Sequence, residues 1–106
     1  IEMAWILVAV AGLLEVAWAL GLKASAGFTR PIPSMLTVIA MVASFYLLAQ
    51  AMKVLPVGTA YAVWVGIGAS LTVIYAMITG AEPVSVLKVI FLLMIVSGVV
   101  GLKAVS

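Results

Sequence analysis

The chain contains no cysteine and no histidine. Without Cys there can be no disulfide, thiolate metal site or thiol chemistry, and without His the commonest metal ligand and near-neutral base is missing. Any acid–base chemistry must therefore use the three carboxylate side chains. No motif resembles a phosphate-binding glycine loop, a nucleophile beside a base or a cluster of metal ligands. We therefore expect neither an enzyme nor a bound cofactor or metal.

Charge is also scarce, because charged residues make up 8% and hydrophobic residues 68% of the 106 residues. So little polar surface cannot cover a soluble domain, and in lipid only helices or closed barrels satisfy the backbone. Long apolar runs without strict alternation favour helices, so we predict an all-α integral membrane protein. The basic residues are scattered rather than clustered, which indicates interfacial anchors and no nucleic-acid partner. They are Lys23, Arg30, Lys53, Lys88 and Lys103.

Four uncharged or nearly uncharged runs predict one domain of four transmembrane helices, at residues 4–22, 34–52, 57–79 and 84–102. At about 1.5 Å per residue each helix is about 29 to 35 Å long, close to the ~30 Å hydrocarbon layer. Ser34 is the expected N-cap of the second helix, and Lys88 should reach the headgroups. The first run is longer than the ~7 to 15 apolar residues of a signal peptide, so we expect it to remain in the mature protein.

The distribution of basic residues gives almost no preferred orientation. An even number of crossings leaves both termini on one side, and the two sides then carry three and two basic residues. We infer that the chain inserts in both orientations, the alternative being chance in so small a count. Two antiparallel copies would form the inverted repeat that many transporters use, and would bring two Glu15 carboxylates near the midplane.

Glu15 is the strongest candidate for a functional residue, because it lies in the middle of the first apolar run. An acidic residue at a helix centre costs roughly 2.5 to 3.5 kcal/mol, and such residues usually face a cavity and bind protons or ions. Gly12 and Trp18 share its helix face at spacing three. Simple close packing is the alternative for Gly12, and a membrane-interface position is the alternative for Trp18.

Other candidates lie on the second and third helices. Ser44 could donate a hydrogen bond to a carboxylate or to a carbonyl of its own preceding turn. Tyr61 and Trp64, at spacing three, could donate to a carboxylate and hold a cation against their rings. Gly66 and Gly68 indicate either a bend or close helix packing.

A patch of small residues lies near the end of the fourth helix. Gly98 and Gly101 follow Ser97 there, in a run without central charge. Small residues let helices approach closely in lipid, so the patch could contact a partner helix or a helix of the same chain.

These motifs carry a resemblance to a known family along the whole chain. Residues 12–18 (GLLEVAW), 27–30 (GFTR), 55–64 (LPVGTAYAVW) and 98–103 (GVVGLK) resemble the small multidrug resistance family. Within the family the chain is similar to the guanidinium exporter subtype, because Trp18, residues 58–61 and residues 101–103 are typical of that branch.

The resemblance implies an antiparallel, dual-topology dimer in the inner (plasma) membrane that exchanges protons for guanidinium and small substituted guanidines. It implies that protons and substrate compete for the Glu15 pair, and that some relatives work as heterodimers with a paralogue. The roles it implies are hydrogen bonding to Glu15 by Trp18, Ser44 and Trp64, gating by Tyr61, pocket shaping by Gly12 and Met41, and a bend at Gly66 and Gly68.

One residue departs from the branch, and rival functions stay open. Val65 stands where that branch usually has a small hydroxyl residue, so a hydrogen-bonding group beside the site is lost. The rivals are an exporter of larger quaternary ammonium or polyaromatic cations, a small dual-topology ion channel and a membrane assembly subunit that transports nothing.

Overall fold

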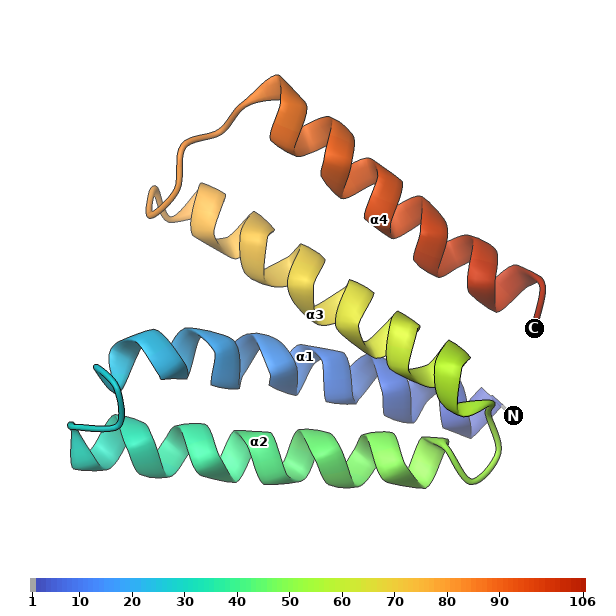
Figure 1. The fold of residues 1–106 in the computed structure, drawn as a ribbon, viewed down its shortest axis with the longest axis horizontal. Coiled ribbons are helices and arrows are strands. Elements are labelled where there is room, and N and C mark those ends of the chain that lie inside the picture. Colours follow the sequence, from blue (N-terminus) through green and yellow to red (C-terminus); the bar gives the residue numbers. More distant parts are fainter. Residues whose placement is uncertain (1) are drawn as a thin grey trace.

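The computed structural model describes residues 2–106, and this part of the chain contains helices and no strand. The helices, drawn in Figure 1, are α1 (Glu2–Ala24), α2 (Pro31–Ala51), α3 (Val57–Ile78) and α4 (Val86–Ala104). All four are long and apolar enough to cross a membrane. The predicted all-helical class with four membrane-capable helices is therefore confirmed.

The helix ends differ from the predicted ranges by at most three residues, and α3 starts at the predicted Val57. The prediction that Ser34 caps α2 was wrong, because α2 begins at Pro31 and its N-cap is Arg30. Proline suits the first helical position, where no N–H is needed, and Ser34 Oγ donates to the Arg30 carbonyl instead (2.5 Å). α4 begins two residues later than predicted because Ser85 is its N-cap and accepts from the Lys88 N–H (3.1 Å).

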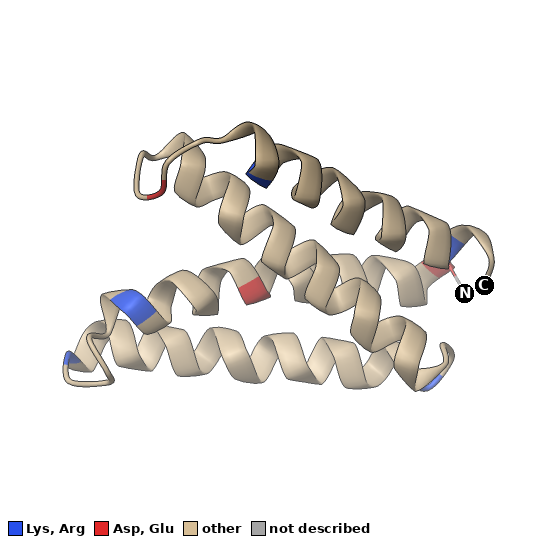
Figure 2. Ribbon diagram, turned by 45° about the horizontal axis from the view of Figure 1, so that its top comes forward, with Lys and Arg blue, Asp and Glu red and all other residues tan. Residues whose placement is uncertain are grey.

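α1 is the central helix of the packing, and α3 crosses it (Figure 1). α1 lies beside α2 and also contacts α3, whereas the backbone of α4 approaches only that of α3. Both termini lie at the same end of the molecule, as an even number of crossings requires. Figure 2 shows the coloured charged positions at helix ends and in loops, apart from one red segment within α1.

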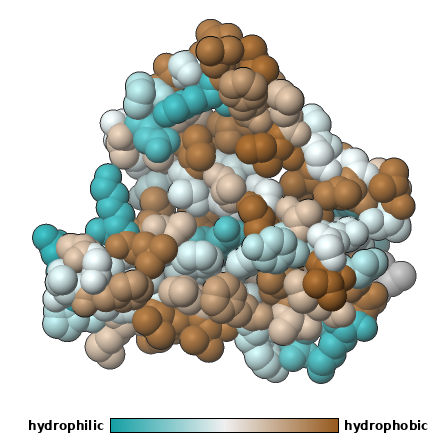
Figure 3. All heavy atoms as spheres, in the orientation of Figure 1, coloured by the Kyte–Doolittle hydropathy of each residue, from teal (hydrophilic) through white to brown (hydrophobic). Residues whose placement is uncertain are grey.

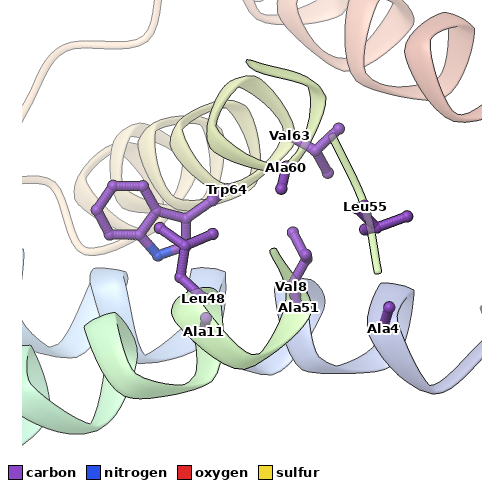
Figure 4. Close-up of a cluster of buried hydrophobic side chains, with 9 residues drawn as sticks. All are labelled: Ala4, Val8, Ala11, Leu48, Ala51, Leu55, Ala60, Val63 and Trp64. Carbon is purple, nitrogen blue, oxygen red and sulfur yellow. The ribbon is translucent and has the colours of Figure 1, made fainter. Parts of the chain in front are cut away.

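Small residues form much of the core where α1, α2 and α3 meet (Figure 4). The buried cluster consists of Ala4, Val8, Ala11, Leu48, Ala51, Leu55, Ala60, Val63 and Trp64. Glycines allow the closest approaches, since a Cβ at Gly12 would overlap Ile67 and a Cβ at Gly21 would overlap Thr37. In lipid no hydrophobic force drives helices together, so such close packing is a main source of association.

A buried serine links the three core helices by hydrogen bonds. Ser44 Oγ, on α2, donates to the Ala11 carbonyl of α1 (2.7 Å) and accepts from Trp64 Nε1 of α3 (3.0 Å). The Ser44 side chain is fully buried, and Trp64 is 6% exposed. Because Ser44 satisfies the indole N–H, Trp64 can be buried at this crossing without an unpaired donor.

α4 is the least buried helix. Leu92 is its one residue classed as buried, and apolar side chains remain exposed along most of its length. Hydrophobic side chains are correspondingly prominent over α4 in Figure 3. Gly98 and Gly101 have open space around them, so packing within the described chain does not explain these glycines.

The Ser44 link predicts a stability difference between two buried serines. Ser44→Ala should lower the free energy of unfolding by about 1–3 kcal/mol, because it leaves the buried Trp64 N–H unpaired. Ser70→Ala is the matched control, since Ser70 is also buried but its hydroxyl has no partner among residues 2–106. Unfolding of the purified protein in mixed micelles measures both. Equal destabilisation by the two substitutions would contradict the role given to Ser44.

Candidate functional site

Glu15 lies in the middle of α1, on the side that faces α3. Its side chain is partly buried, and Oε1 is buried and makes no hydrogen bond to any of residues 2–106. The one salt bridge among residues 2–106 joins Lys88 and Glu82 (3.6 Å). It lies at the end of α3 that is opposite the chain termini. The Glu15 carboxylate therefore has no protein cation beside it. Such a group is costly in an apolar span unless it holds a proton or pairs with a cation.

Gly68 provides the space that the Glu15 side chain occupies. A Cβ at Gly68 would overlap the Glu15 carboxylate, so any larger residue there would displace it. Gly68 is buried. On α1, one turn before Glu15, Gly12 packs closely against Ile67 of α3. The absence of side chains at these glycines thus fixes how deeply Glu15 enters the α1–α3 crossing.

An aromatic cluster from three helices forms the second part of the site. Trp18 of α1 lies 5.9 Å from Phe45 and 6.4 Å from Trp64, between ring centroids. Trp64 also lies 5.8 Å from Phe45 and 5.6 Å from Tyr61. Tyr61 and Phe45 are about half exposed, whereas Trp64 is buried. The cluster therefore has exposed rings against which a cation could be held.

The hydrogen bonds expected at Glu15 are not made within the described chain. Ser44 and Trp64 bond to each other, and Ser44 donates to Ala11 rather than to Glu15 or to its own preceding turn. Ser44 therefore makes neither of the two expected hydrogen bonds within residues 2–106, and its role at the site stays a prediction. Trp18 Nε1 is buried and has no partner among residues 2–106. A buried donor at Trp18 and a buried acceptor at Glu15 thus remain unpaired one helical turn apart.

Gly12, Met41 and Val65 all lie at least partly buried among the helices. Gly12 is buried at the α1–α3 crossing, and Met41 is partly buried on α2, one turn before Phe45. Val65 is partly buried and packs against the core cluster. Its methyl groups therefore add to helix packing where a hydroxyl residue would need a partner.

The glycines assigned to a bend and to dimer packing have different surroundings. α3 is one continuous helix through Gly66 and Gly68, and both are buried packing positions, because a Cβ at Gly66 would overlap Val99 of α4. The bend stays a prediction. Gly98 and Gly101 are exposed, so contact with a partner helix also stays a prediction.

Two features of the site did not emerge from the sequence. Phe45 was not singled out, although its spacing of four from Met41 places it on a face near the predicted site residues. The seating of Glu15 against Gly68 had no sequence signal, because it depends on how α1 and α3 cross.

Comparison with known proteins agrees with this architecture. The family model described as Small Multidrug Resistance protein matches residues 3–95. A guanidinium exporter of Yersinia pseudotuberculosis is 54% identical over 104 residues, 98% of this chain and all of that protein. A guanidinium exporter of Escherichia coli strain K12 is 52% identical over 101 residues, 95% of this chain and 96% of that protein.

A guanidinium exporter of Proteus vulgaris is 51% identical over 104 residues, and the match spans the whole of that protein. The family match includes the Glu15 position, Ser44 and the aromatic cluster, which all lie between residues 3 and 95. The chain therefore belongs to the small multidrug resistance family and is a multi-pass protein of the inner membrane.

Proposed function

We propose that this protein is a transporter that exports guanidinium ion and small substituted guanidines in exchange for protons. The observation that carries the proposal is Glu15, whose carboxylate lies in the middle of a membrane span with one oxygen buried and no cation partner among the described residues. The names of relatives that share 51–54% identity over nearly the whole chain support guanidinium as the substrate.

In the proposed mechanism, a proton and the substrate compete for Glu15. A carboxylate that holds a proton is neutral, and one that pairs with guanidinium is balanced, so either state lowers the cost of burying the charge. Loading the cation expels the proton, which lets a proton gradient drive export. The planar guanidinium ion suits a carboxylate because it can present two parallel N–H donors to the two oxygens.

The aromatic cluster would complete the cation site. Guanidinium offers only donors, so the unpaired Trp18 N–H cannot bind it and would instead donate to Glu15 beside it. The exposed ring of Tyr61 would face the cation, while Ser44 keeps Trp64 in a fixed orientation. This division of roles makes Ser44 a positioning residue rather than a ligand.

A second, oppositely oriented copy of the chain would complete the transporter. Four helices give one chain no inverted repeat, and the exposed α4 with its open glycines offers a surface for a partner helix. The paired copy would supply the second Glu15. A paralogous chain could take that place, so transport must be tested with this chain alone.

Glu15→Gln should abolish guanidinium-driven proton movement in liposomes of the purified chain, because the amide cannot exchange a proton or balance a cation. Glu82→Gln is the matched control, because Glu82 lies exposed in the loop before α4, and it should keep exchange near the wild-type rate. A pH dye inside the vesicles reports exchange.

The same assay separates the rival functions. Exchange with a bulky aromatic cation but not with guanidinium would identify an exporter of larger cations. A current without proton movement, unaffected by Glu15→Gln, would identify a channel. Either result, or full exchange by the Glu15→Gln variant, would contradict the proposal.

Dual insertion predicts that one introduced cysteine is labelled from both sides of the membrane. The chain has no cysteine of its own, so Ser106→Cys and Ala81→Cys each provide a unique label at opposite ends of the helices. An impermeant maleimide applied outside intact cells should label about half of each variant, because each site faces outward in one of the two orientations. Complete labelling of one variant and none of the other would show a single orientation.

A further inference from the structure

A cleft between α1, α3 and α4 is separate from Glu15 and the aromatic cluster. It has a volume of about 380 Å³, and Ala9, Val63, Ile67 and Val99 form apolar walls. Trp5 and Lys103 also line it, and they lie near the ends of α1 and α4 where the chain termini are found. Neither Glu15 nor any ring of the aromatic cluster lines it. We propose that this cleft binds an anionic phospholipid, with one acyl chain in the groove and the headgroup phosphate on Lys103.

A second apolar cleft lies next to the first along α3. The second cleft, of about 180 Å³, shares Ile67 and Val99 with the first and extends to Ile74 and Val96. From Val63 to Ile74 the groove follows α3 for eleven residues, or about 16 Å at 1.5 Å per residue. One leaflet of the hydrocarbon layer is about 15 Å thick, half of the ~30 Å core. The two clefts together thus cover a length comparable to that of one acyl chain.

Lys103 provides the charge that a phosphate requires. Its ammonium lies 5.5 Å from the centre of the Trp5 ring and makes no salt bridge within residues 2–106. Glu2 is the acidic residue at this end of α1, one turn before Trp5. It is exposed and does not pair with Lys103. The ammonium therefore keeps its donors for a phosphate, while the tryptophan lies at the depth where indoles contact headgroups.

The lining of the groove favours a lipid over a second copy of this chain. Gly98 and Gly101, which offer α4 a surface for a close-packed helix, do not line either cleft. A lipid needs only a cationic end and an apolar channel, and this groove has both.

Quenching of tryptophan fluorescence by brominated lipids tests the proposal. The full-length protein is placed in bilayers that contain either brominated phosphatidylglycerol or brominated phosphatidylcholine at equal mole fraction. The difference between the wild type and Trp5→Phe isolates the Trp5 signal from Trp18 and Trp64. One lysine near the surface contributes about 1 kcal/mol toward an anionic lipid, so phosphatidylglycerol should bind about fivefold more tightly.

Three variants decide whether Lys103 makes that site. Lys103→Ala should remove the preference, Lys103→Arg should keep it, and Lys53→Ala, on the same side of the membrane, is the matched control that should also keep it. Soluble glycerol phosphate should not relieve quenching, which separates a lipid from a free phosphate. Equal quenching by both lipids, loss of the preference in Lys53→Ala, or a Trp5 that no lipid quenches because a second copy fills the groove would overturn the proposal.

Discussion

The Ser44 hydroxyl joins three helices, because it donates to Ala11 on α1 and accepts from Trp64 on α3. In a bilayer no hydrophobic force drives helices out of lipid and onto one another, so a few hydrogen bonds and close glycine contacts determine how they pack. Ala11 lies one turn before Glu15 on α1, so the same link positions the carboxylate and Trp64 together. The helix-linking polar groups are thus satisfied, whereas Glu15 and Trp18 are left without protein partners among the described residues.

This contrast accounts for the proposed mechanism. In that mechanism the Ser44 hydrogen bonds would hold the scaffold, and the one central carboxylate would be free to exchange partners. α4 completes the division, because it is packed on one side only and leaves apolar surface exposed along its length. In the proposed dimer, part of that surface would meet the second chain, and the groove beside Lys103 would hold a lipid. Scaffold, exchange site and membrane contacts would then occupy different faces of the same four helices.

Sequence reasoning predicted the helices well because their signal is local. Long apolar runs of membrane length specify α1 to α4, and Glu15 is conspicuous as a charge in the middle of one of them. Capping was predicted less well, since Pro31 and Ser85 rather than Ser34 mark helix starts. The partner of Ser44 and the contact of Glu15 with Gly68 could not be predicted, because they depend on how separate helices cross. A period of 3.6 residues places side chains on a face but does not say which helix that face meets.

The most direct measurement of the central claim is proton release when guanidinium binds to the purified protein in weakly buffered detergent solution. If proton and cation share Glu15, adding guanidinium should acidify the solution by up to one proton per chain, and Glu15→Gln should release none. The release should vanish at a pH high enough for Glu15 to have lost its proton before the cation is added. Guanidinium binding without proton release at any pH, or equal release by the Glu15→Gln protein, would contradict the account.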